Sequence, residues 1–215
     1  MILTDNRFTI DYFEKLPTDI KRITVAASGG LDSSLILYCL AKTLNDRRQY
    51  DTTIFIHHDI VLKYKHTRSQ RILKQVLLFI REKFPNVNIE EPYYGHQPTF
   101  IKSKMIYGAF SLLITHLRTR SQLTIIGYTK QDDETHKGLK KWLHRLVIKV
   151  RPQQFPFKDV DKHFVKAQYD QLGLHELSLM TGTCVEDVYG GMPCRKCKWC
   201  KIRYEAFGTY DYGYV

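Results

Sequence analysis

Two stretches of the chain carry the residue types that could do chemistry, one rich in Gly and Ser and the other rich in Cys. The first, ITVAASGGLDSS, places Ser28, Gly29 and Gly30 directly after an apolar run rich in β-branched residues. Two adjacent glycines allow a tight turn and a close approach of the backbone to a ligand, while Ser33 and Ser34 open a helix with amide and hydroxyl donors. A strand, a tight turn and a helix N-terminus in this order predict a cradle for phosphate or pyrophosphate.

The alternative for this stretch is a plain strand-to-helix turn that uses Gly and an N-capping Ser or Asp. The complete Ser-Gly-Gly-x-Asp-Ser-Ser string, in its place between a strand and a helix, favours the phosphate site. A Walker loop needs a Lys before its Ser or Thr, and this stretch has none. The sequence therefore disfavours transfer of a γ-phosphoryl group.

The Cys-rich stretch lies near the end of the chain, where Cys184 is followed after nine residues by Cys194, Cys197 and Cys200. Four thiolates at these spacings can close a tetrahedral zinc site. An iron–sulfur cluster is the alternative for such ligands, whereas disulfides would be cramped at the two-residue spacings. Cys39 stands apart among apolar residues of the first expected helix, which predicts a buried small side chain.

Basic residues crowd around these cysteines. A Zn(Cys)4 centre is formally dianionic, so the nearest role of the basic residues is charge compensation. A nucleic-acid patch is the alternative, with Trp199 and Tyr204 available for stacking on bases. The basic residues are Arg195, Lys196, Lys198, Lys201 and Arg203.

The overall composition is typical of a globular chain with polyanionic partners. Of the 215 residues, 43% are hydrophobic and 26% are charged, and 33 Lys and Arg outnumber 22 Asp and Glu. The net charge of +11 favours nucleotides or nucleic acid as partners. The sequence shows no apolar run long enough for a membrane span and no signal peptide, and five Cys are too few for a disulfide scaffold. We expect a cytoplasmic protein with no membrane partner.

The elements that must position the two stretches alternate along the chain. Apolar runs predict strands, and stretches with apolar residues three and four apart predict helices. Strands that alternate with helices of this length imply right-handed crossovers and an α/β fold with a mainly parallel, doubly wound sheet. The expected strands are residues 23–27, 53–57, 87–89, 123–127 and 146–150, and the expected helices are residues 33–44, 68–84, 99–117 and 161–172.

The same pattern divides the chain into three parts. An N-terminal arm over residues 1–20, with a short helix expected over 10–16, comes first. An α/β nucleotide-binding domain over residues 21–175 follows it. A C-terminal zinc knuckle over residues 176–215, which holds the four clustered Cys, completes the expected organisation.

The Gly- and Ser-rich stretch resembles the loop of the PP-loop ATP pyrophosphatases, which cleave ATP to AMP and pyrophosphate while they adenylate a substrate. The resemblance implies a Rossmann-like fold of the adenine nucleotide alpha hydrolase type, with ATP and Mg2+ as cofactors. It also implies that the loop backbone holds the leaving pyrophosphate, that Asp32 helps to place Mg2+ or the loop, and that Ser28 and Ser33 donate hydroxyl hydrogen bonds. The residues implied for ATP binding are Ala27, Ser28, Gly29, Gly30, Leu31, Asp32, Ser33, Ser34, Leu35, Ile36, Leu37, Gly127 and Asp132.

With the four Cys added, nearly the whole chain resembles the 7-cyano-7-deazaguanine synthases. IIGYTKQDD at residues 125–133 resembles a strand of that family that ends in Gly and precedes an acid, and PFKDVDK at 156–162 resembles its segment before a helix. TGTC at residues 181–184 resembles the segment with the first zinc ligand, and Arg203 and Phe207 match an Arg and an apolar residue of the family. The catalytic residues that the resemblance implies are Ser28, Asp32, Ser33 and Lys162. It implies Zn2+ on Cys184, Cys194, Cys197 and Cys200.

The chain departs from this family where the substrate base would be recognised. The family's Tyr-Gly-Gln segment and its Arg-Asn pair are replaced by HHDIVLKYKHTRSQ and QPTFIKSKM. His57, His58 and Asp59 follow the second expected strand, where doubly wound sheets place ligands, although solvated loop residues are the favoured interpretation of the two His. Asp132 either orients substrate or metal, or caps a helix, and Lys162 either serves the site or is a solvated helix residue.

From these residues we expect an ATP-dependent carbon–nitrogen ligase that converts 7-carboxy-7-deazaguanine and ammonia into 7-cyano-7-deazaguanine through an acyl adenylate. ATP is needed because a carboxylate offers only oxide or hydroxide as a leaving group, whereas an acyl adenylate offers AMP. One alternative is a tRNA-modifying PP-loop enzyme that adenylates a base before thiolation or amination. Another is a nucleotide-binding relative without catalytic activity. The expected partners are the small deazapurine acid and ammonia, with nucleic acid as the alternative and a homodimer left open.

Overall fold

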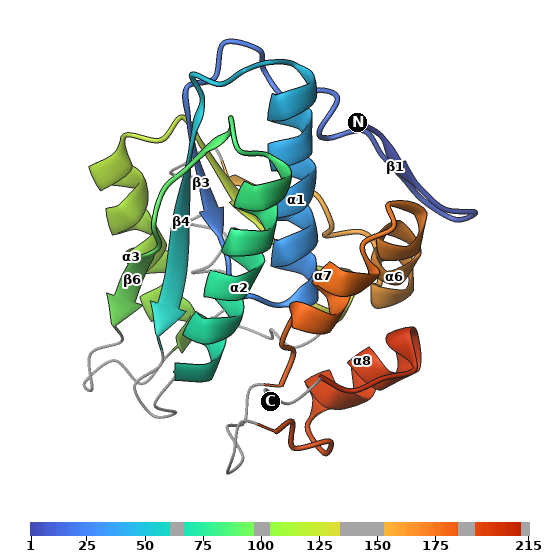
Figure 1. Cartoon of the computed structure of the whole chain (residues 1–215). Helices are drawn as coiled ribbons and strands as arrows, with labels where there is room; N and C mark the ends of the chain where they lie inside the picture. Colours follow the sequence, from blue (N-terminus) through green and yellow to red (C-terminus); the bar gives the residue numbers. More distant parts are fainter. Residues whose placement is uncertain (61–66, 97–103, 134–152, 185–191, 212–215) are drawn as a thin grey trace.

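A parallel sheet forms the centre of the molecule (Figure 1). The computed structural model describes residues 1–60, 67–96, 104–133, 153–184 and 192–211. The strand order is β5-β4-β3-β7-β8, with β6 paired to the far end of β4, and every described pairing in this sheet is parallel. The strands are β3 (Arg22–Ala26), β4 (Thr53–Ile60), β5 (Asn88–Ile89), β6 (Tyr93–His96), β7 (Leu123–Ile126) and β8 (Gln153–Gln154).

Helices cover both faces of this sheet, as a parallel sheet requires. In Figure 1, α1 (Leu31–Asp46) and α2 (Thr67–Lys83) lie on one face and α3 (Lys104–Thr119) lies on the other. Side chains of the central strand β3 point alternately to the two faces. Ile23 and Val25 join the hydrophobic core, whereas Thr24 hydrogen-bonds Ser121, just beyond α3. The remaining helices are α4 (Lys130–Asp133), α6 (Lys162–Gln171), α7 (His175–Met180) and α8 (Lys198–Phe207).

The mainly parallel α/β fold expected from the sequence is confirmed, and most of the expected elements lie within a few residues of their observed bounds. α6 begins where Asp161 caps it, since the Asp161 carboxylate accepts a hydrogen bond from the Phe164 amide at 2.9 Å. Gly173, with φ of 65°, follows its C-terminal end. The expected strand at 146–150 lies outside the described residues, and β8 follows it in sequence as an edge strand.

The expectation of a helix over residues 10–16 is wrong. Residues 11–16 form a turn instead, which follows an antiparallel hairpin of β1 (Leu3–Thr4) and β2 (Thr9–Ile10). Phe13 is fully buried in the core, and Gln168 of α6 donates a hydrogen bond to the Thr4 carbonyl. The apolar side chains of this segment are therefore buried through tertiary contacts, which fix a conformation that the helical spacing did not predict.

The strand order contains a switch point next to the Gly- and Ser-rich turn. From β3 the chain passes to β4 and β5 on one side, and it later returns to β7 on the other side. In open α/β sheets, ligands bind outside the carboxyl ends of the strands at such a point. Figure 1 shows that α8, near the end of the chain, lies at this same end of the molecule. Among the described residues, no helix is long and apolar enough to cross a membrane.

Candidate functional site

The turn after β3 has the geometry of a helix N-terminus that is open to a ligand. Gly29 takes a positive φ of 76°, which favours glycine. The Ser33 hydroxyl donates to the Gly30 carbonyl at 3.2 Å, and the Gly30 amide donates to the Ser28 hydroxyl at 3.3 Å. These bonds hold the turn in a compact loop just before α1, whose first amides have no partner within the helix.

A hollow of about 240 Å³ lies at this turn, at the carboxyl ends of β3, β4 and β7. The turn forms one wall and the ends of the neighbouring strands form the others. The loop residues and strand ends expected from the sequence meet here, together with residues that the sequence predictions did not assign to ATP. The lining residues are Ala26, Ala27, Ser28, Gly30, Asp32, Ser33, His57, Asp59, Ile126 and Gly127.

Gly127 holds a place that no larger residue fits. A Cβ atom on Gly127 would lie 2.9 Å from the Ser33 amide nitrogen and 3.0 Å from the Ser33 Cα atom, both of which belong to the backbone. The end of β7 and the first turn of α1 therefore pack backbone against backbone. This contact sets where the amides of the turn point.

Asp32 and Lys162 form a buried ion pair at the edge of the hollow. The Lys162 ammonium group donates to Asp32 Oδ2, and the two side chains are 5% and 11% exposed. Lys162 comes from the first residue of α6, 130 residues further along the chain. The solvated interpretation of Lys162 is therefore wrong. The ion pair holds the Lys162 ammonium group next to the first turn of α1.

Several residues expected to bind ATP do not line the hollow. Leu35, Ile36 and Leu37 are fully buried in the hydrophobic core, one turn or more into α1. Gly29, Leu31 and Ser34 support the turn from behind, outside the lining. Asp132 lies in α4, and its side chain is outside the described part of the structure.

The two His at the end of β4 are not solvated loop residues, and that interpretation is wrong. His57 and His58 are each 2% exposed. The His58 ring bonds the Ala27 carbonyl at 2.8 Å through Nδ1 and Ser69 Oγ at 3.1 Å through Nε2. His58 therefore supports the turn from the side of α2. The run TIFIHHDI has three apolar residues followed by three polar ones, so its pattern carries no signal that β4 extends through the two His.

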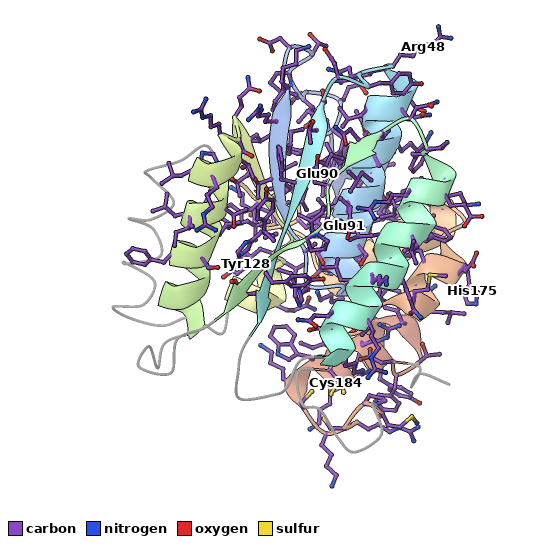
Figure 2. The ribbon with its side chains drawn as sticks, turned by 60° about the vertical axis from the view of Figure 1, so that its left-hand side comes forward. Arg48, Glu90, Glu91, Tyr128, His175 and Cys184 are labelled. Atoms are coloured by element: carbon purple, nitrogen blue, oxygen red, sulfur yellow. The ribbon has the colours of Figure 1, made fainter. Side chains whose placement is uncertain are left out.

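The four clustered Cys form a compact site at the N-terminus of α8. Their Sγ atoms all lie within 4.8 Å of one another, and those of Cys194 and Cys200 are 3.9 Å apart. Figure 2 shows sulfur atoms gathered beside the label of Cys184, at the end of the molecule opposite Arg48. Four ligands at about 2.3 Å around one tetrahedral ion lie about 3.8 Å apart, so the spacing fits a single metal ion.

Backbone amides of the same segment point at these sulfur atoms. The amides of Cys194, Cys197 and Cys200 donate to the Sγ atoms of Cys184, Cys194 and Cys197, at 3.3 to 3.4 Å. Burial tends to raise the pKa of the Cys194 thiol, but amides of Lys196 and Cys197 lower that pKa overall. Burial raises the pKa of the Cys200 thiol instead. The segment thus favours negative charge on the Cys194 sulfur, as a metal ligand needs, but not on the Cys200 sulfur.

The Cys segment is tied directly to the turn after β3. The Gly182 amide donates to the Gly29 carbonyl at 3.1 Å, two residues before Cys184. The Asp211 carboxylate accepts from the amides of Thr183 and Cys184 at 2.7 and 2.8 Å. Cys184 and the turn after β3 therefore belong to one continuous set of contacts.

Arg203 is not part of a surface patch, which corrects its assignment to the charged surroundings of the Cys. It is 1% exposed, donates to the Thr181 carbonyl and hydroxyl and to the Thr183 hydroxyl at 3.0 to 3.1 Å, and pairs with Asp211. The other basic residues of this segment are exposed, namely Arg195, Lys196, Lys198 and Lys201. Tyr204 beside them is 50% exposed and stacks on Tyr210 with 4.7 Å between ring centres.

A second, larger hollow of about 490 Å³ lies at the opposite edge of the sheet. It is lined by the segment around Tyr12 and Ile20 and by the first residues of β7. None of the residues expected to be functional lines it. The candidate site is therefore the hollow at the carboxyl edge, where the turn, the ion pair and the Cys segment meet.

Comparison with known proteins gives a likeness of fold. No family model matches the sequence, and no curated protein matches it. The structure is similar to that of the U34-tRNA thiolase NcsA from Methanococcus maripaludis with its [4Fe-4S] cluster, with a TM-score of 0.52 and 14% identity. The match covers 75% of this chain and 60% of that chain, so this chain spans less than two thirds of the thiolase. At this identity the likeness shows a shared α/β fold alone.

A universal stress protein in complex with cAMP is more distant. Its TM-score is 0.41 at 12% identity, over 66% of this chain and 96% of that chain. At that TM-score the likeness carries no argument about function.

Proposed function

We propose that the chain is an ATP-dependent adenylating enzyme of the PP-loop type, which releases pyrophosphate and passes AMP to a nucleobase. The observation that carries the proposal is the turn from Ser28 to Ser33, which faces a hollow beside the switch point of the sheet. Helix N-terminal amides bind phosphate because they are unpaired donors at the positive end of the helix dipole. The absence of a Walker Lys makes pyrophosphate, not a γ-phosphoryl group, the natural ligand of the turn.

The residues of the turn would act on the leaving group. An oxygen of the acceptor attacks the α-phosphorus, the bond to the bridging oxygen breaks, and pyrophosphate leaves with the electron pair. Amides at the start of α1 and the Ser28 hydroxyl would stabilise the charge that grows on pyrophosphate, and the Ser33 hydroxyl would add a donor once it turns from the Gly30 carbonyl. Lys162 does not itself line the hollow, but it adds a cation behind Asp32, and its pairing with Asp32 holds it there in the absence of nucleotide.

A magnesium ion would accompany ATP. It neutralises phosphate charge and keeps the leaving group in line. Asp32 fits as its protein ligand, because a carboxylate oxygen is a hard donor of the kind that Mg2+ prefers and because Asp32 lines the hollow.

Two acceptors fit this chemistry, and we place a base of tRNA first. The fold is similar to that of a U34-tRNA thiolase, and tRNA-thiolating enzymes are among the PP-loop enzymes that the turn resembles. Four exposed Lys and Arg residues with the exposed Tyr204 beside them supply charge and a stacking surface on the Cys segment. After adenylation, a sulfur or nitrogen nucleophile would displace AMP from the base.

The free acid 7-carboxy-7-deazaguanine is the second candidate. The observation that favours it is the contact between Arg203 and Thr181, two residues that match the 7-cyano-7-deazaguanine synthases on either side of the Cys. Their contact gives a physical reason for that pattern, since Arg203 fixes the backbone that leads to Cys184. Here the carboxylate would be adenylated and ammonia would displace AMP.

Product analysis distinguishes the two acceptors. The protein is incubated with ATP, Mg2+, ammonium and sulfide, and with either total tRNA or 7-carboxy-7-deazaguanine. We expect AMP and pyrophosphate in equal amounts, and a nucleoside of altered mass in digests of the tRNA. RNA binding should weaken by orders of magnitude between about 50 and 200 mM salt.

Conversion of the free acid without RNA would instead establish the second candidate. Release of ADP and phosphate, or no release of pyrophosphate with either acceptor, would contradict the proposed function itself.

We also propose that the four Cys bind one zinc ion. A four-iron cluster presents a different iron to each thiolate, which requires wider spacing of the sulfur atoms than the 4.8 Å found here. Four Cys leave no open position for a bound water, so the ion would supply folding energy to the segment. Its bonds would complement the amide contacts that already hold the sulfur atoms.

Purified protein is expected to contain about one zinc ion per chain. Cys197→Ser should lower both the metal content and the Tm, because the binding energy of a structural ion contributes to folding. Metal analysis and thermal melting measure the two effects. Cys39→Ala is the matched control, since Cys39 is buried in the core on α1 and should leave the metal content unchanged. Iron with visible absorbance, or full zinc in Cys197→Ser, would refute the assignment.

A further inference from the structure

One carboxylate in the hollow has no part in the chemistry described above. Asp59 lies near the end of β4, next to the strand that leads into the turn, and it lines the hollow with a side chain that is 35% exposed. In the part of the chain that the structure describes, no Lys or Arg lies within ion-pair distance of it. Its described partner is His57, whose Nε2 atom lies 3.0 Å from Asp59 Oδ1.

A chain of contacts fixes the position of this carboxylate. His57 is 2% exposed, and its Nδ1 atom lies 2.8 Å from the hydroxyl oxygen of Thr115 on α3. With the Thr115 hydroxyl donating to Nδ1, a neutral His57 carries its proton on Nε2 and donates it to Asp59. On the other side, Gly108 of α3 comes so close that a Cβ atom there would lie 2.8 Å from Asp59 Oδ2. The carboxylate is thus held between the ring and the helix, with one edge toward the hollow.

The pairing of β3 with β4 shows how this carboxylate lies relative to the turn from Ser28 to Ser33. Ala26 on β3 pairs with His57 on β4, and the Ala27 amide donates to the His57 carbonyl at 2.8 Å. Asp59 lies two residues further along β4, beyond the last paired residue of β3, and it lines the same hollow as Ser28 and Gly30. Because the turn and the end of β4 line one hollow, a ligand whose phosphates occupy the turn can place its next group over the end of β4.

We propose that Asp59 binds the ribose of the nucleotide, accepting hydrogen bonds from its 2′- and 3′-hydroxyl groups. This inference rests on the proposed use of ATP. An ionised carboxylate only accepts hydrogen bonds and repels phosphate, so a vicinal diol next to the phosphates is the part of ATP that it suits. A carboxylate at the end of the second strand, after a glycine-rich loop and its helix, has this role in dinucleotide-binding sheets. His57 and Gly108 are positioning residues for it.

Nucleotides that lack one hydroxyl test the proposal directly. Binding of ATP, 2′-deoxy-ATP and 3′-deoxy-ATP is measured by titration calorimetry, with Mg2+ and without acceptor, for wild type and Asp59→Asn. We expect Asp59→Asn to weaken ATP binding about ten- to a hundredfold, as for the loss of hydrogen bonds to a charged group. The deoxynucleotides should bind wild type more weakly than ATP, and Asp59→Asn should weaken their binding much less.

Two further variants control for effects on folding. Asp51→Asn removes an exposed carboxylate just before the other end of β4 and should leave all three affinities unchanged. Gly108→Ala displaces the Asp59 carboxylate without removing its charge, and it should weaken ATP binding more than binding of the deoxynucleotides. Thermal melting of each variant shows whether it is folded, and Gly108→Ala carries the test if Asp59→Asn is not.

Equal losses for ATP and both deoxynucleotides, or no loss at all, would overturn the proposal. A higher Mg2+ requirement in Asp59→Asn with every nucleotide would make Asp59 a metal ligand and would overturn it as well. Failure of wild type to bind any of the three nucleotides would instead contradict the proposed function, so the two failures are distinguishable.

Discussion

Replacing Asp32 with Ala is expected to lower the free energy of unfolding by about 3–5 kcal/mol, because it leaves the Lys162 ammonium group buried without its partner. The Lys162 side chain is 5% exposed and cannot reach water without moving the start of α6. Urea denaturation of wild type and variant measures the difference. Loss of pyrophosphate release in Asp32→Ala would then reflect folding as well as chemistry.

The double variant separates the two contributions. Asp32→Ala combined with Lys162→Met removes both charges, and it should recover most of the stability that either single variant loses. Asp46→Ala is the control, since the Lys42–Asp46 pair on the exposed side of α1 should contribute at most about 0.5 kcal/mol. A single Asp32→Ala variant as stable as wild type would show that the pair is not buried in solution.

The turn and the strand before it could be predicted because their determinants are local. Val25 and its β-branched neighbours favour a strand, and the two glycines favour a tight turn, whatever lies elsewhere in the chain. The alternation of strands and helices predicted a parallel sheet around that strand. The spacing of the four Cys predicted that they form one cluster. Local sequence also predicted α6, through the cap at Asp161 and the stop at Gly173.

The features that could not be predicted depend on residues far apart in the sequence. Lys162 is buried because it forms an ion pair with Asp32, which lies 130 residues earlier in the sequence. Arg203 is buried because it contacts the carboxylate of Asp211 and the carbonyl of Thr181. A Lys or Arg in a polar stretch gives no sign of such partners, so exposure is the reasonable expectation. The hairpin in residues 1–10 likewise depends on packing against α6.

For the same reason the sequence does not fix the roles of His57 and Asp59. Their place after an apolar run was visible in the sequence, but the length of β4 and the approach of α3 were not. Only the closeness of Gly108 and the hydroxyl of Thr115 turn a His and an Asp into a fixed arrangement that faces the hollow. The arrangement of His57 and Asp59 on β4 therefore depends on contacts with α3.

Gly127→Ala is expected to reduce the rate of pyrophosphate release about a hundredfold while the protein stays folded. The new Cβ would lie 2.9 Å from the Ser33 amide nitrogen, a backbone atom, so the first turn of α1 must move away from β7. A misplacement of up to 1 Å can cost this much rate when the displaced groups hold the leaving group. The accompanying loss of stability should be about 1–3 kcal/mol, as for other overpacked sites.

Gly173→Ala is the matched control for this substitution, because Gly173 has a φ of 65° and no atom within 4 Å of an added Cβ. Its left-handed backbone should cost about 1–2 kcal/mol of stability, yet it lies beyond α6 and outside the lining of the hollow. We therefore expect similar unfolding free energies for the two variants and a loss of pyrophosphate release for Gly127→Ala only. Only Gly127→Ala displaces the contact between β7 and α1. If both variants released pyrophosphate at the wild-type rate per folded molecule, or if both released it more slowly, this contact would not set the phosphate site.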